Sequence, residues 1–297
     1  MSKIKRLEKD NAISSAGDII KAVLTNISKP KRKEITGLVT GFIELDKFLL
    51  GFNEGSLIIV AGHPGIGATA FALRISEYLS IDNDIPVLYF SMGLGKEQLI
   101  ERMLLGRAKI NLKRAHKGAL EKQELDIVKE IASTIEKKPL YVDDTSRLTF
   151  SEIRDRTEKF RSLKEIKYVV VDFLQAMRSE SNIDLKEEEF AEISRCLKLM
   201  ALEFKVHVLL LVELNFDLIR EEEERTQPRL ADFGKAIIVE RFADVLMLIN
   251  RENYYGYCAP DSTFTEIMIT KNHNGPTGMV GLDFYDEFAR FENIITE

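Results

Sequence analysis

A glycine-rich segment in the first quarter of the chain has the spacing of a phosphate-binding loop but lacks its lysine. Residues 62–69 read GHPGIGAT and fit the Walker A pattern G-x-x-x-x-G-K-[ST] at every fixed position except the lysine, where Ala68 stands. Backbone N–H groups of such a loop bind phosphate oxygens. The ammonium group of the missing lysine would bridge the β- and γ-phosphates and stabilise their charge in the transition state. The candidate nucleotide-binding residues here are Gly62, Gly65, Gly67 and Thr69. For this segment alone, a strand–helix turn without a ligand is the alternative.

A carboxylate at the end of an apolar run supplies the second half of such a site. Residues 168–173 read YVVVDF, so Asp172 follows four residues of strand character, as in a Walker B segment. Many parallel strands end in Asp, and this run by itself has little specificity. Together, the two segments predict a P-loop core in which Thr69 and Asp172 hold Mg²⁺ when nucleotide binds.

The elements that must position these residues alternate between short apolar runs and longer helical patterns. The predicted strands span residues 56–62, 86–92, 139–144, 168–173, 206–214, 244–251 and 266–272. Segment 68–79 has helical spacing and follows the phosphate loop directly. Near-continuous apolar strands separated by helices indicate an α/β fold with a mostly parallel central sheet covered on both faces.

The first 34 residues are predicted to form a separate region, followed by a core domain over 35–297. This region comprises a polar tail, an amphipathic helix at 15–28 and the charged linker KPKRKE at 29–34. The candidate interface residues on the helix are Ile20, Leu24 and Ile27. Such an apolar stripe packs either on its own domain or on a neighbouring subunit, and sequence position alone favours neither.

The composition excludes several classes of protein. The formal net charge is −6, which argues against a protein that coats nucleic acid by bulk charge. Two distant cysteines and four scattered histidines provide neither a disulfide framework nor a metal cluster. The chain has no apolar run of the roughly 18 residues that a membrane span requires, and its first residues lack a signal-peptide pattern. We therefore expect a cytoplasmic protein without a membrane partner.

Five segments in order resemble the C-terminal motor domain of the DnaB-type replicative DNA helicases. They are residues 35–62, 141–156, 169–177 (VVVDFLQAM), 189–204 and 271–282 (KNHNGPTGMVGL). The resemblance implies a RecA-like P-loop NTPase core preceded by a linker helix. It covers roughly residues 14–294 and does not include the family's separate N-terminal helical domain. In that family the linker helix packs against the adjacent subunit of a hexameric ring, which favours inter-subunit docking for helix 15–28.

Three positions that carry the family's chemistry hold other residues in this chain. Ala68 replaces the Walker A lysine, Gly93 replaces a glutamate that orients the attacking water, and His273 replaces an arginine finger, whereas Lys271 is retained. An arginine finger alone contributes about 10³–10⁵ in rate. A nearby cation such as Lys96 or Lys271 could compensate for one loss but not for all three. The resemblance implies ATP and Mg²⁺ as ligands, the missing lysine predicts that they bind weakly, and no other cofactor is expected.

The segments expected to face single-stranded DNA mix cations with many glutamates. In the resemblance they are the loops at about 178–188 and 216–229, the second of which follows VEL at 212–214, where the family has Ser-Gln-Leu. The candidate DNA-binding residues are Arg178, Lys186, Arg220, Arg225 and Arg229. Phosphate affinity depends on uncompensated cations, so the run Glu221–Glu224 predicts weak DNA binding. Pairing of these cations with neighbouring glutamates on a solvated surface is an equal alternative.

The leading functional hypothesis is a catalytically degenerate, DnaB-like homologue that acts in DNA replication by assembly. It would form its own ring, such as a hexamer, or would regulate or load a replicative DnaB-type helicase. One alternative is an active ATP-dependent 5′–3′ DNA helicase with relocated catalytic groups. Another is an interaction module that binds neither nucleotide nor DNA.

Overall fold

A computed structural model of the chain describes residues 15–28, 35–179, 186–214, 230–251, 254 and 262–295. The chain divides into two compact units, Met1–Thr36 and Gly37–Glu297. The first unit contains the helix predicted at 15–28, α2 (Ala16–Ser28). In the described ranges, no helix combines the length and the apolar character needed to cross a bilayer.

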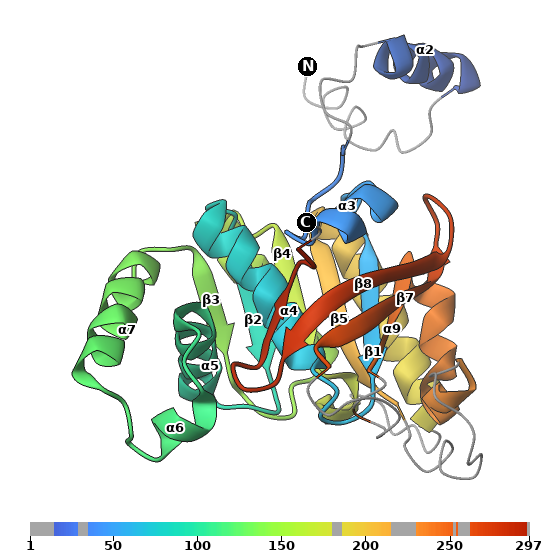
Figure 1. Ribbon diagram of the computed structural model, residues 1–297. Helices are drawn as coiled ribbons and strands as arrows, with labels where there is room; N and C mark the ends of the chain where they lie inside the picture. Colours follow the sequence, from blue (N-terminus) through green and yellow to red (C-terminus); the bar gives the residue numbers. More distant parts are fainter. Residues whose placement is uncertain are drawn as a thin grey trace. The chain divides into compact units, whose positions relative to one another are not determined.

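The second unit is built on one nine-stranded sheet with the order β3-β2-β4-β5-β1-β6-β7-β8-β9 (Figure 1). The parallel strands are β1 (Leu57–Gly62), β2 (Val87–Ser91), β3 (Leu140–Asp143), β4 (Tyr168–Asp172), β5 (His207–Glu213) and β6 (Val245–Asn250). The antiparallel strands are β7 (Phe264–Asn272), β8 (Gly278–Tyr285) and β9 (Arg290–Glu292). All seven predicted strands are present, and the mostly parallel sheet is confirmed.

Strands β8 and β9 are absent from the sequence-based prediction. In β8 (GMVGLDFY) two glycines interrupt the apolar pattern, and β9 has only three residues. Both strands are too weak in local signal to be identified without the antiparallel neighbour that pairs with them.

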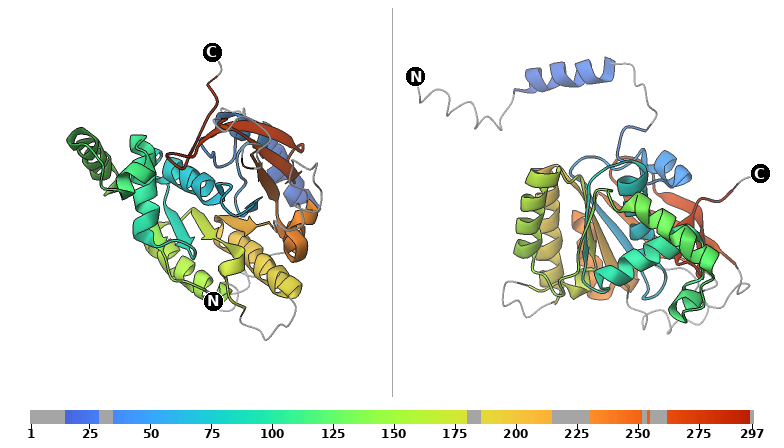
Figure 2. Two further views of the ribbon diagram at one scale, coloured as in Figure 1. Left: turned by 60° about the horizontal axis from the view of Figure 1, so that its bottom comes forward. Right: turned by 90° about the vertical axis from the view of Figure 1, so that its left-hand side faces the viewer.

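Helices cover both faces of the sheet (Figure 2). The α-helices are α3 (Ile43–Leu49), α4 (Ala68–Glu77), α5 (Lys96–Ala108), α6 (Leu112–His116), α7 (Lys122–Ile135), α8 (Phe150–Lys164) and α9 (Lys186–Phe204). Shorter or irregular helices are η1 (Tyr78–Asp82), η2 (Leu174–Ala176) and η3 (Leu230–Phe242). One core contains side chains of α3, α4, α5 and the antiparallel strands, and the other contains side chains of α8, α9 and η3.

Strand β1 shows why the central runs are apolar at every position. Leu57 and Ile59 belong to the core under α9, whereas Ile58 and Val60 belong to the core under α4, and all four side chains are fully buried. A parallel strand covered on both faces has no solvent side, so it cannot show the alternating pattern of a half-exposed strand.

The helix that follows the phosphate loop is fixed by aromatic contacts. On α4, the Phe71 ring stacks on Phe42 with a centroid distance of 5.1 Å and meets Phe291 edge-on at 5.5 Å. Such pairs contribute about 0.5–1.5 kcal/mol each beyond their buried area. They hold α4 between the segment that precedes β1 and the last strand, β9.

The buried His207 at the start of β5 predicts acid sensitivity of the fold. Burial lowers the pKa of His207 from 6.5 to about 4, and its Nδ1 has no hydrogen-bond partner within the described ranges. Because the unfolded chain takes up the proton first, the stabilisation is complete above about pH 6.5. It falls as the pH drops towards 4, by about 3 kcal/mol in total.

Urea unfolding at pH 7 and pH 4.5 measures this effect, with His207→Gln as the variant that cannot titrate. We expect the free energy of unfolding to fall less between the two pH values in the variant than in the wild-type chain. An equal fall in both proteins would contradict the assignment to His207.

Candidate functional site

The loop between β1 and α4 has the backbone geometry of an anion-binding nest. Gly65 and Gly67 have φ values of +81° and +114°, in the left-handed region that favours glycine. A Cβ on Gly67 would lie 3.1 Å from the Phe291 ring. Helix α4 begins directly afterwards at Ala68, so its first N–H groups have no partner within the helix and carry its positive dipole end. The local backbone therefore suits a phosphate group.

This loop is anchored by an arginine that directly follows β6. Arg251 is 3% exposed, lies over the Phe284 ring at 4.3 Å and donates to the Ile66 carbonyl at 3.3 Å. It also forms an ion pair of 2.5 Å with Asp286. The loop conformation thus depends on the antiparallel part of the sheet as well as on its own glycines.

A cavity of about 450 Å³ lies against the loop and gathers most of the predicted site. Its lining includes Gly65, Gly67, Ala68, Thr69, Gly93 and Asp172. Gly62 ends β1 below the loop, where an added Cβ would lie 2.5 Å from Ile66, so a larger residue would displace the loop. The volume and the mixed lining are typical of a small-ligand site.

The two predicted magnesium ligands are adjacent. The Thr69 side chain hydrogen-bonds to Asp172, and the Tyr89 hydroxyl donates to Asp172 Oδ2 at 2.8 Å. Burial raises the pKa of Asp172, against the opposing effect of these bonds and of the charge on Arg102. The arrangement fits Mg²⁺, since a cation would favour the ionised carboxylate that burial disfavours.

The two cavity positions at which the resemblance expects a lysine and a glutamate offer only small groups to a ligand. Ala68 presents a methyl group to the cavity, and Gly93 presents none. A Cβ added at Gly93 would lie 3.1 Å from the Phe173 ring, so Phe173 occupies part of the space where a glutamate side chain would start.

The other predicted residues with roles at the phosphates lie elsewhere in the same chain. Lys271 Nζ donates to the Glu240 carbonyl at 2.6 Å, and His273 Nδ1 lies 3.3 Å from Asp244. Lys96 Nζ lies 3.6 Å from Asp144 and lines a different cavity. The hypothesis that Lys96 or Lys271 compensates for the lost lysine within its own chain is therefore not supported. Action of Lys271 or His273 on a neighbouring subunit stays a prediction.

Sequence reasoning missed three side chains that belong to this site. Tyr89 binds Asp172, Arg102 lines the cavity from α5, and Glu213 lines it from the end of β5. Glu213 had a usable signal because it ends an apolar strand, and its register partner is Gly62. Burial and the charge of Asp172 raise the pKa of Glu213. Arg102 had no local signal, since only the packing of α5 brings it to the loop.

The two described DNA-binding candidates face glutamates. Arg178 Nη2 lies 3.9 Å from Glu152, and Lys186 Nζ lies 2.6 Å from Glu189. The remaining candidates, Arg220, Arg225 and Arg229, lie outside the described residues.

Comparison with known families identifies the chain. The family described as DnaB-like helicase C terminal domain matches residues 37–293. The chain belongs to this family. The resemblance drawn from the five sequence segments is thereby confirmed, and with it the DnaB-like, RecA-type fold.

Two relatives agree with this membership. The replicative DNA helicase DnaB of Leifsonia xyli is 33% identical over 285 residues, which cover 95% of this chain and 60% of that protein. The replicative DNA helicase DnaC of Bacillus subtilis is 32% identical, with 96% and 63% covered. The DnaB-like chain thus spans about three fifths of the length of these relatives.

Two solved structures have a fold similar to that of this chain. A structure described as an ATPase domain superimposes with a TM-score of 0.87 at 26% identity, covering 95% of this chain and 100% of that one. A structure of a DnaB-like replicative helicase and its interactions with primase gives a TM-score of 0.85, also at 26% identity, with 99% of this chain and 71% of that one covered.

A pair of buried tyrosines tests how far Asp172 depends on its hydrogen bonds. Tyr89→Phe removes the donor to Asp172, and we expect the free energy of unfolding to fall by about 1–3 kcal/mol because a buried carboxyl group loses a partner. Tyr168→Phe is the matched control, since Tyr168 is equally buried and its hydroxyl has no hydrogen-bond partner among the described residues. Chemical denaturation measures both variants, and an equal loss in the two would contradict a special role for Tyr89.

Proposed function

We propose that this chain acts in DNA replication as a DnaB-like subunit that binds ATP with Mg²⁺ and assembles, but hydrolyses ATP poorly. The observation that carries the proposal is the contrast within one cavity. The glycine nest and the Thr69–Asp172 pair are intact. In contrast, position 68 presents only a methyl group to the cavity, and position 93 has no side chain. The groups that would bind the nucleotide are thus present, whereas positions 68 and 93 do not supply the groups that would drive hydrolysis.

The residues present fit the ligand that the family implies. The nest at Gly65 and Gly67 would bind phosphate oxygens, and Thr69 with Asp172 would hold Mg²⁺. Bound Mg²⁺ would supply charge neutralisation to the phosphates. Without the Walker A lysine, we expect weaker ATP binding than in a site that has all these groups.

The turnover test compares the wild-type chain with two variants. We expect ATP hydrolysis below about 1 s⁻¹, the low end of ordinary enzyme rates, with or without single-stranded DNA. Ala68→Lys should tighten nucleotide binding yet leave hydrolysis poor, because Gly93 and His273 remain. Wild-type hydrolysis above that rate that disappears in Asp172→Asn would contradict the proposal, and so would robust hydrolysis in Ala68→Lys.

One observation favours a second candidate function, an ATP-dependent 5′–3′ DNA helicase with relocated catalytic groups. The Glu213 carboxylate lines the cavity together with Asp172 and could orient a water molecule in place of the absent glutamate. If the turnover test gives activity, Glu213→Gln should abolish it.

Assembly is supported by an apolar face on α2. Ile19, Ile20, Val23 and Leu24 are between 45% and 59% exposed within the described residues, and the side chain of the predicted interface residue Ile27 lies outside them. A helix of 13 residues is marginal in water by itself, so this face needs a partner to be stable. We propose a second copy of this chain as that partner, with docking on a separate replicative helicase as the other outcome.

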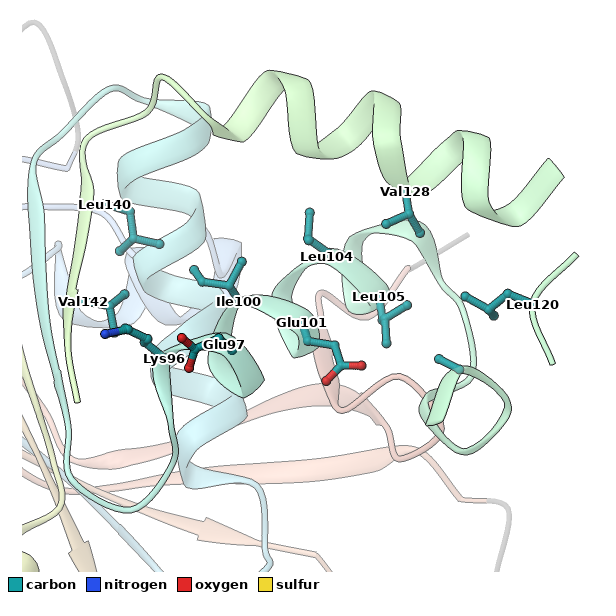
Figure 3. A pocket seen from close by; sticks show the side chains of 11 residues that line it. Lys96, Glu97, Ile100, Glu101, Leu104, Leu105, Leu120, Val128, Leu140 and Val142 are labelled. Atoms are coloured by element: carbon teal, nitrogen blue, oxygen red, sulfur yellow. The ribbon is translucent and has the colours of Figure 1, made fainter. Parts of the chain in front are cut away.

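The core offers an apolar cavity that suits such a helix. This cavity has a volume of about 680 Å³. Its apolar lining side chains come from α5, α7 and β3 and include Ile100, Leu104, Leu105, Val128 and Leu140 (Figure 3). Charged side chains of Lys96, Glu97 and Glu101 lie along one side of it. Recognition of an amphipathic helix typically uses an apolar groove with charged residues at its margin.

Matched charge insertions test this assembly. Leu24→Asp on α2 and Leu104→Asp in the groove should each lower the oligomeric mass measured by light scattering, because a buried Leu contributes about 1.5–3 kcal/mol. Lys21→Glu changes the charge of α2 away from the apolar face and should leave the mass unchanged.

A wild-type mass that both aspartate variants preserve would contradict docking of α2 in this groove. A monomeric wild-type chain would contradict self-assembly, and co-purification with a replicative helicase, lost in Leu24→Asp, would then identify the other occupant.

We propose that contact with single-stranded DNA is weak. Its support is that Arg178 and Lys186 each have a glutamate beside them, so neither is an uncompensated cation.

A further inference from the structure

The cavity at the phosphate loop contains a guanidinium that has no hydrogen bond or ion pair to any described residue. Arg102 on α5 lines the cavity, is half-buried, and forms no ion pair or hydrogen bond in the part of the chain that the structure describes. Arg107, on the same helix, is instead paired with Glu77 at 2.8 Å and with Asp82 at 2.9 Å. Arg102 is therefore not part of the ion-pair network that fixes α5.

A half-buried guanidinium needs an acceptor to replace lost hydration. It carries five N–H donors in a planar fork that matches phosphate oxygens in pairs. Asp172, the acid on which its charge acts, already accepts from Tyr89 and bonds to Thr69. The donors of Arg102 thus remain available to a ligand in the cavity.

The charges of the side chains that line the cavity make Arg102 important for binding an anionic ligand. Its charged lining side chains are Arg102, Asp172, Glu213 and Asp286, and Asp286 is paired with Arg251. Arg102 is the one cation among the described lining residues, facing two acids without a basic partner. Beside these acids, an anionic ligand would gain from Mg²⁺ and from this guanidinium as well as from the backbone N–H groups of the loop.

We propose that Arg102 replaces the Walker A lysine as the cation that binds the terminal phosphate of a nucleoside triphosphate. The inference rests on the proposed nucleotide binding at this cavity, and it names the residue that would supply the positive charge in place of the lysine. Arg102 and Ala68 line the same space, and the charge of Arg102 acts on Asp172. Asp172 and Thr69 would hold Mg²⁺, which would bring the terminal phosphates of a bound nucleotide to this side of the cavity. Arg102 therefore distinguishes ATP from ADP.

The experiment measures Mg²⁺-dependent binding of ATP, ADP and AMP by titration calorimetry. In Arg102→Ala we expect ATP affinity to fall by about tenfold to a hundredfold, the range for a lost hydrogen bond to a charged group. ADP and AMP affinities should change little, so the preference for ATP over ADP disappears. Arg102→Lys should restore part of that preference. Lys113→Ala removes an exposed cation next to the cavity-lining Leu112 and should leave all three affinities unchanged.

Each other result overturns the inference in a distinguishable way. An Arg102→Ala chain that keeps the preference for ATP excludes a role at the terminal phosphate. An equal loss for ATP, ADP and AMP, with a lowered melting temperature, shows that Arg102 only supports the fold. In both cases, wild-type binding that is lost in Gly67→Val leaves the proposed nucleotide binding standing. Absence of nucleotide binding by the wild-type chain overturns both.

Discussion

The parallel register of β2, β4, β5 and β1 is the constraint on which the site depends. In-register pairing sets Ser91 opposite Asp172 and Gly62 opposite Glu213, so the polar residues that end these strands meet at one edge of the sheet. Each of these strands is buried on both faces. A slip of one residue in β4 or β5 would therefore exchange the two core faces of that strand and move its carboxylate out of the cavity.

The scaffold and the chemistry are physically separate in this DnaB-like chain. The cores on the two faces of the sheet are built from apolar side chains that do not include positions 68, 93 or 273, although Ala68 packs at the margin of one. Exchange of a lysine, a glutamate or an arginine at those positions therefore leaves the packing that stabilises the fold largely intact. The loop itself is held by Arg251, Phe284 and Phe291, which explains how its shape persists without the lysine.

The charges of the side chains around the phosphate loop determine which ligand this cavity favours. Burial raises the pKa values of Asp172 and Glu213, so the cavity accommodates negative charge poorly unless a cation is bound. Arg102 and Mg²⁺ are the two sources of positive charge that the geometry provides for. In the proposed function, such a site would favour a metal–nucleotide complex over free nucleotide and would hold that complex with little hydrolysis.

Local sequence was enough to predict the seven principal strands and the glycine-rich turn between β1 and α4, and it identified Thr69 and Asp172, which the fold places side by side. Apolar runs and glycine spacing are encoded by neighbours along the chain. It was not enough for β8 and β9, whose short or glycine-interrupted runs become strands only beside β7. Nor could it show that Lys96 and Lys271 point to other partners while Arg102, Tyr89 and Glu213 converge on Asp172. Those contacts join residues far apart in the chain, and only the packing of α5 on the sheet and the order of the strands bring them together.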